Sequence, residues 1–102
     1  MSSGREPWYR RLQLDGGKSF EELSPSEQVD VACDVYEQEW QQGAEPLIEN
    51  YLADLQVGLR KRAFQELVPL ECEYRIQRGK KISFRELADR FPEYSLVISR
   101  TI

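Results

Sequence analysis

The 102-residue sequence contains no histidine and only two cysteines. Without histidine, the serine–histidine and cysteine–histidine pairs that activate many enzymatic nucleophiles are excluded, and so is the ligand of most zinc sites. Cys33 and Cys72 alone cannot complete a four-ligand structural zinc site. Neither of the glycine-rich patterns that bind nucleotide phosphates is present. We therefore expect this chain to have no catalytic residues, no metal site, no cofactor and no small-molecule substrate.

Long apolar runs are also missing. No stretch approaches the roughly 18 apolar residues of a membrane-spanning helix. The N-terminus lacks the basic start and apolar stretch of a signal peptide. Cys33 and Cys72 fall within helical apolar patterns, so we expect two buried thiols, because a disulfide would need an oxidising compartment. The sequence thus predicts a cytoplasmic protein that does not associate with membranes.

Positive charge is absent from one part of the chain. Residues 19–59 include ten acidic residues and neither lysine nor arginine, whereas residues 60–102 include ten basic and six acidic residues. Two interpretations remain open. The two halves pack with complementary rims, or one charged face meets a partner, where charge steers association more than it adds affinity.

Apolar residues recur with the spacing of α-helices along most of the chain. One such face consists of Val29, Cys33, Tyr36 and Trp40, and another of Leu59, Ala63, Leu67, Leu70 and Tyr74. The second stripe is flanked by further apolar residues, including Phe64, Val68, Cys72 and Ile76, so its helix should be central. No alternating pattern bounded by hairpin turns occurs. The predicted fold class is all-α.

Capping patterns mark the predicted helix boundaries. Capping boxes are predicted for the pairs Ser19–Glu22, Ser24–Glu27 and Ser83–Glu86. Gly43 and Gly79 are placed to end the two long helices, and Pro92 ends a shorter one. Val57–Gly58 is predicted to be a connector, and Pro69 should kink the helix near residues 65–69.

An internal repeat of 36 residues relates the two halves. The aligned pairs are Glu37 with Glu73, Gln41 with Gln77, Gly43 with Gly79, Pro46 with Ile82, Ile48 with Phe84 and Tyr51 with Leu87. Common ancestry and shared capping patterns explain the repeat equally well. The sequence predicts a compact bundle of about five helices, built from two helix–glycine–short-helix hairpins. Residues 1–18 would form an N-terminal arm, and residues 19–102 a single helical domain.

Most aromatic residues are assigned to the core of this bundle. The core assignment covers Trp40, Tyr51, Tyr74 and Phe91. We expect the short helix before Pro92 to face the core with Phe84, Leu87 and Ala88. The last helix should face the core with Leu96 and Val97, together with Ile98 and Ile102. The carboxylates are all assigned to solvent-facing positions.

Two blocks of residues carry a resemblance to a known family. The first block includes Val29, Asp30, Cys33, Asp34, Tyr36, Glu37, Trp40 and Gly43, then Pro46, Ile48, Glu49, Tyr51 and Leu52. The second includes Glu66, Leu67, Leu70, Glu71, Glu73, Tyr74, Arg75 and Gly79, then Glu86, Leu87, Arg90, Phe91, Pro92, Glu93 and Tyr94. Residues 29–102 thus resemble the segment that precedes the catalytic domain in planctomycete-type bacterial serine/threonine protein kinases. The sequence departs from that pattern at Pro69, at Ile82 and around Val57–Gly58.

The resemblance implies a non-catalytic interaction or regulatory module attached to such a kinase, because the His-Arg-Asp and Asp-Phe-Gly motifs are absent here. It would bind a protein partner or self-associate. The candidate partner-binding residues are Arg75, Arg78, Lys80, Lys81 and Arg85, with Trp8 and Tyr9 as a second contact if the N-terminal arm is not folded in. The alternatives are a helix-turn-helix-like nucleic-acid-binding domain at residues 84–100 and a purely structural spacer. The net charge of -4 disfavours nucleic acid.

Overall fold

In the computed structural model, residues 6–10, 12 and 14–101 are described, and all their regular secondary structure is helical. The α-helices are α1 (Pro25–Gln41), α2 (Ile48–Ala53), α3 (Val57–Gln77), α4 (Phe84–Arg90) and α5 (Ser95–Thr101). Three short 3-10 turns, η1 (Asp15–Gly17), η2 (Phe20–Glu22) and η3 (Pro92–Tyr94), accompany them. The all-α prediction is confirmed for these residues. No described helix combines the length and apolar character that crossing a membrane requires.

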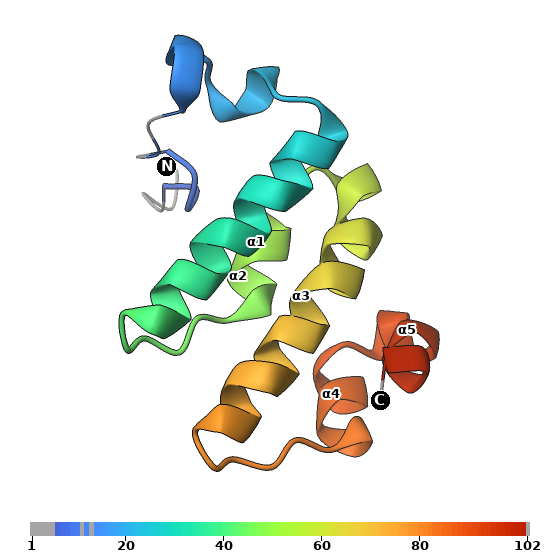
Figure 1. Ribbon diagram of the computed structural model, residues 1–102. Coiled ribbons are helices and arrows are strands. Elements are labelled where there is room, and N and C mark those ends of the chain that lie inside the picture. The colour runs from blue at the N-terminus through green and yellow to red at the C-terminus, as the bar shows by residue number, and fades with distance from the viewer. Residues whose placement is uncertain (1–5, 11, 13, 102) are drawn as a thin grey trace.

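Helix α3 is the centre of the bundle. It packs against α1, α2 and α5, and α4 packs in turn against α5 and η3. Figure 1 shows α1 and α3 side by side, with the chain reversing after each long helix into a short one. The bundle of two hairpins and the central position of the third predicted helix are therefore confirmed.

The helix starts follow the predicted caps, with one difference. In α1, the Ser24 hydroxyl accepts a hydrogen bond from the Glu27 amide at 3.2 Å, and the Glu27 carboxylate accepts one from the Ser24 amide at 3.0 Å. At α4, the Ser83 hydroxyl accepts from the Glu86 amide at 3.1 Å. Among the described contacts, however, the Glu86 carboxylate lies 3.6 Å from the Arg75 guanidinium instead of closing the box.

Both long helices end in the same glycine motif. Gly43 and Gly79 have φ values of 96° and 76°, in the left-handed region that favours glycine. The amide of the following residue returns to the carbonyl five positions earlier, Ala44 to Glu39 at 2.9 Å and Lys80 to Arg75 at 2.8 Å. These bonds define Schellman motifs. The two motifs are separated by the 36 residues of the sequence repeat, so the repeat extends to backbone geometry.

The core is continuous across both hairpins. Its largest fully buried apolar side chains are Tyr36, Phe64, Ile48, Leu67, Leu87, Ile98, Val29 and Val68. Trp40, Tyr51 and Phe91 are at most 3% exposed, as predicted. Tyr74 is only half-buried, because its ring stacks on the outside of Trp40 and its hydroxyl donates to Glu37 at 3.1 Å.

Several side-chain predictions are wrong. Ile76, Phe84 and Leu96 are 65%, 43% and 76% exposed, because no neighbouring helix covers their sides of α3, α4 and α5 in the described structure. Cys33 and Cys72 are free thiols, but they are half-buried, since each lies at the edge of its helix's buried face. Ile102 lies outside the described residues.

The backbone predictions for α3 also need correction. This helix begins at Val57, so Val57–Gly58 form its first turn and not a connector. The side chain of Arg60 donates to the Leu55 and Ala53 carbonyls at 3.1 and 3.3 Å, which ties this first turn to the end of α2. Pro69 is exposed and the helix continues through it to Gln77, while the expected kink stays a prediction.

Candidate protein-interaction site between α3 and α4

A buried charge cluster sets the position of α4. The Glu71 side chain on α3 is 1% exposed. Arg90 at the end of α4 donates to it from Nη1 at 2.7 Å and from Nη2 at 3.3 Å, and the Tyr36 hydroxyl donates to it at 3.4 Å. The Nε atom of Arg75 lies 2.9 Å from Glu71 as an ion pair, although it does not point at the oxygen in hydrogen-bonding geometry. A buried carboxylate needs such partners to remain charged.

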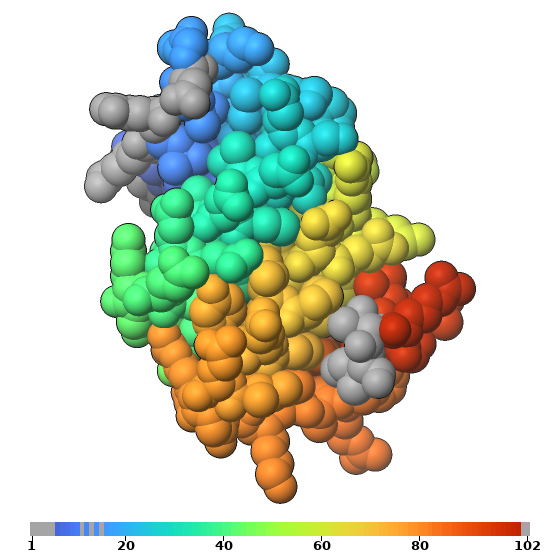
Figure 2. All heavy atoms as spheres, in the orientation of Figure 1, coloured from blue at the N-terminus to red at the C-terminus, as the bar shows by residue number. Residues whose placement is uncertain are grey.

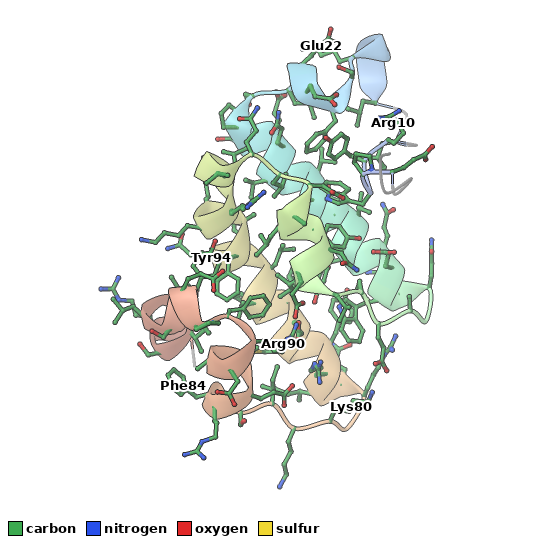
Figure 3. All side chains as sticks on the ribbon, turned by 180° about the vertical axis from the view of Figure 1, so that it is seen from behind. Arg10, Glu22, Lys80, Phe84, Arg90 and Tyr94 are labelled. Atoms are coloured by element: carbon green, nitrogen blue, oxygen red, sulfur yellow. The ribbon has the colours of Figure 1, made fainter. Side chains whose placement is uncertain are left out.

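Arg90 also connects α4 to α2. Its Nε and Nη2 atoms donate to the two carboxylate oxygens of Glu49 at 3.0 and 2.9 Å. Burial is the largest single influence and would raise the pKa of Glu49, but the hydrogen bonds from Arg90, a backbone hydrogen bond and the charges of Arg90 and Arg75 together outweigh it and hold this pKa below its ordinary value. Burial would likewise lower the pKa of Arg90, and its two carboxylate partners raise it instead. Figure 3 shows Arg90 between α4 and α3. One guanidinium therefore holds three helices in register.

The connector between α3 and α4 forms an open groove. Ile76, Gly79, Lys80, Lys81 and Ile82 line a hollow of about 390 Å³, which we call the α3–α4 docking surface. Ile76 is 65% exposed and Ile82 is half-buried, so apolar surface is open to water there. Figure 2 shows side chains of this end of the molecule, in orange, projecting at the bottom of the view.

The rim of the α3–α4 docking surface is basic. Lys80 Nζ lies 2.7 Å from a Glu45 carboxylate oxygen, and this lysine lowers the pKa of Glu45. Lys81 on this rim, and Arg85 in the first turn of α4, are exposed and form no ion pair with any described residue. Positive charge beside apolar surface favours a ligand that is both acidic and apolar.

The other predicted basic contacts have partners inside the molecule. Arg75 pairs with Glu71 and Glu86. The Nη2 atom of Arg78 donates to the Trp40 carbonyl at 2.6 Å, and its guanidinium lies 4.6 Å from the centre of the Trp40 ring. Arg78 thereby joins α3 to α1, as complementary rims would, whereas Arg75 joins α3 to α4. Their role in partner binding stays a prediction, and Lys81 and Arg85 are the candidates with free charge.

Trp8 and Tyr9 lie together against the first hairpin. The Trp8 ring centre is 4.9 Å from that of Tyr51 and 5.2 Å from that of Phe20, and its indole nitrogen donates to the Tyr51 carbonyl at 3.2 Å. Tyr9 stacks on Phe20 at 4.2 Å. These aromatic residues are thus folded against the bundle, where Trp8 lines the same hollow as Glu45, the partner of Lys80. A second contact there stays a prediction.

Two features of this site were missed by the sequence interpretation. The sequence prediction places Glu71 on a solvent face, although Glu71 follows Leu67 by four residues and therefore lies on the buried stripe of α3. The prediction also places Ile76 beside that stripe, although it lies in the last turn of α3, three residues before Gly79. Its position at a helix end was the available signal that it would lack a neighbour.

The fold and this site describe a small helical bundle with an exposed basic and apolar groove. No group of three or more cysteine, aspartate or glutamate side chains that could hold a metal ion occurs in the described part of the chain. No family model matches the sequence, and no similar protein is found among curated proteins or solved structures. The resemblance to the kinase segment therefore depends only on the residues quoted for it.

Proposed function

We propose that this chain is a non-catalytic protein-interaction module that binds an acidic, partly apolar segment of a partner protein at the α3–α4 docking surface. The observation that carries the proposal is the 65% exposure of Ile76 beside the free charge of Lys81. Burying such a side chain stabilises a complex by about 1.5–3 kcal/mol. The basic rim would select acidic partners and accelerate their association.

The resemblance of residues 29–102 extends this proposal to a biological setting. The module would be attached to a cytoplasmic bacterial serine/threonine protein kinase and would recruit a substrate or regulator to it. This setting is supported only by the resemblance, in which the segment precedes the catalytic domain.

The direct test is fluorescence anisotropy with a labelled synthetic peptide that alternates glutamate and leucine. The chain should bind this peptide, and the affinity should fall as salt is added. Ile76→Ser and Lys81→Glu should each weaken binding by about tenfold or more, since tenfold corresponds to about 1.4 kcal/mol. Peptides alternating glutamate with serine, or lysine with leucine, should bind more weakly, because each lacks one half of the proposed complementarity.

Matched variants elsewhere on the same helix provide the control. Val57 is 76% exposed and Lys61 is exposed near the opposite end of α3. Val57→Ser and Lys61→Glu should leave peptide binding unchanged. Equal losses at both ends of α3, or no loss with Ile76→Ser, would contradict the assignment of the groove.

Three alternatives become outcomes of related measurements. Concentration-dependent dimerisation in sedimentation, abolished by Ile76→Ser, would make a second copy of this chain the occupant. Retention of DNA in a salt-dependent gel shift would favour the helix-turn-helix reading. In α5, Val97 and Ile98 are buried and Arg100 is the sole basic residue. The exposed face of α5 therefore offers little positive charge for binding DNA. A chain that binds nothing in any of these assays would be a spacer.

A further inference from the structure

Ser83 occupies a distinctive place at the edge of the α3–α4 docking surface. It directly follows Ile82, and Lys81 and Lys80 stand two and three positions before it. Its side chain is exposed, and its backbone is extended, with φ at -118° and ψ at 153°. Its hydroxyl oxygen accepts one hydrogen bond, from the Glu86 amide, and the connector before it has no regular structure.

We propose that Ser83 is a phosphorylation site for a basophilic serine kinase, meaning a kinase whose acidic substrate groove selects basic residues shortly before the serine. In this transfer the Ser83 oxygen forms a bond to the γ-phosphorus of ATP. The bond from that phosphorus to the β,γ-bridging oxygen breaks, ADP leaves, and the hydroxyl proton passes to a base of the kinase. An exposed, extended connector with two lysines fits such a groove by charge and by shape.

The other serines of the described chain lack this combination. Ser24 and Ser95 have glutamate two positions earlier, and Ser99 follows Val97 by the same distance. The Ser26 hydroxyl is bonded to Arg62 and lies in the first turn of α1. Ser19 has glycines, Gly17 and Gly16, two and three positions earlier, where Ser83 has lysines. The pattern therefore singles out Ser83.

Phosphorylation would change the charge of the docking surface, and this consequence rests on the proposed function. A phosphoserine adds about -1.5 to -2 charges at pH 7. Placed beside Lys81 and two residues before Arg85, it would cancel the free positive charge of the rim. An acidic partner would then be repelled where it was attracted, and its affinity should fall about tenfold at low ionic strength.

The acceptor assignment is tested by incubating the whole chain with ATP and a kinase of the cyclic-AMP-dependent type, followed by intact mass and peptide mapping. One phosphoryl group should appear at Ser83. Ser83→Asn should receive none, and it still folds because asparagine also caps helices. Replacing Lys80 and Lys81 by alanine should slow the transfer about tenfold or more, whereas Lys61→Ala should not.

Two results would overturn the acceptor assignment. One is transfer to other serines of the wild-type chain. The other is no transfer to the chain under conditions that phosphorylate a free peptide copied from residues 76–88, since the folded connector would then be inaccessible.

The regulatory consequence is measured with the labelled glutamate–leucine peptide. Phosphorylated chain should bind it about tenfold more weakly than unmodified chain, with Ser83→Asp in between and Ser83→Asn unchanged. Equal binding by both forms overturns the switch while the proposed function stands. Absence of binding by the unmodified chain overturns the proposed function and the switch together, and the mass measurement still decides the acceptor assignment.

Discussion

Arg90 on α4 donates a 2.7 Å hydrogen bond from Nη1 to Oε2 of Glu71 on α3, and the Glu71 side chain is 1% exposed (Figure 3). The pair lies where α2, α3 and α4 meet, because the same guanidinium also bonds Glu49. A buried ion pair contributes little net stability over apolar packing, but removal of one partner is costly. The position of α4, and with it the connector that forms the docking surface, depends on this contact.

Arg90→Met should destabilise the protein by about 3 kcal/mol, because Glu71 would lose its bidentate partner while remaining buried. Chemical denaturation followed by circular dichroism measures the change in the free energy of unfolding. Arg85→Met is the matched control on the same helix, since Arg85 is exposed and pairs with no described residue. It should change stability by no more than about 0.5 kcal/mol.

The double variant Glu71→Met/Arg90→Met tests the cause of that loss. If the penalty arises from an uncompensated buried carboxylate, removal of both charges should restore most of the stability. Additive losses in the double variant would instead point to packing by the two side chains. An Arg90→Met variant as stable as the wild type would contradict the structural role of the pair.

Glu49 should make stability depend on pH in the acid range. Its pKa is below the ordinary value of 4.5 because Arg90 binds the carboxylate. Between the folded and unfolded pKa values the unfolded chain binds more protons, so stability rises with pH there. The contribution is complete above the unfolded value and is lost as pH falls through the folded value. Denaturation at a series of pH values measures the free energy of unfolding, which should fall less steeply at acid pH in Glu49→Gln than in the wild type. Identical pH dependence in the two proteins would refute this assignment.

Local sequence signals were sufficient to predict the helices and most of their ends, the start of α3 excepted. The capping serines, the positive-φ glycines and the helical spacing around Leu67 act within one or two turns, so they can be read without knowledge of neighbours. Glu71 could not be interpreted in this way. Its helical phase places it on the buried face, but only the folded arrangement brings Arg90 from another helix to pair with it.

The candidate site was predictable in its charges but not in its apolar half. Lys80, Lys81 and Arg85 are conspicuous beside Gly79, whereas the exposure of Ile76 depends on which sides of α3 are covered by α1, α2 and α5. The start of α3 shows the same limit. Gly58 favours a connector by local propensity, but the contacts of Arg60 with the end of α2 outweigh a cost of about 1 kcal/mol.

Alanine at two glycines should change stability in opposite directions. Gly79 has φ at 76°, so Gly79→Ala should destabilise by about 1 kcal/mol through left-handed strain. Gly58 lies within α3 with no positive φ, and Gly58→Ala should stabilise by about 0.5–1 kcal/mol. An added Cβ meets nothing within 4 Å at either position, so backbone conformation alone decides the sign. Thermal unfolding measures both, and a destabilised Gly58→Ala would contradict the helical start at Val57.

The thiol of Cys33 should react slowly in the folded protein. Burial, reinforced by Glu66, Asp30, Asp34 and Glu37, raises its pKa to about 12. At about pH 8 its thiolate fraction is then roughly a thousandfold lower than that of an unfolded cysteine with a pKa of about 8.5. Alkylation of Cys72→Ser, which isolates Cys33, should therefore be slow until denaturant is added.

Neutralising acidic residues near Cys33 separates the effect of charge on its thiol from the effect of burial. Glu66 and Asp30 are exposed, so Asp30→Asn with Glu66→Gln removes two carboxylates that disfavour the Cys33 thiolate. Because burial is the larger cause, this change in the Cys72→Ser background should accelerate alkylation only modestly, by less than tenfold. Full acceleration to the unfolded rate would show that charge and not burial protects the thiol. Equal alkylation rates in folded and denatured Cys72→Ser would contradict the half-buried position of Cys33 at the edge of the buried face of α1.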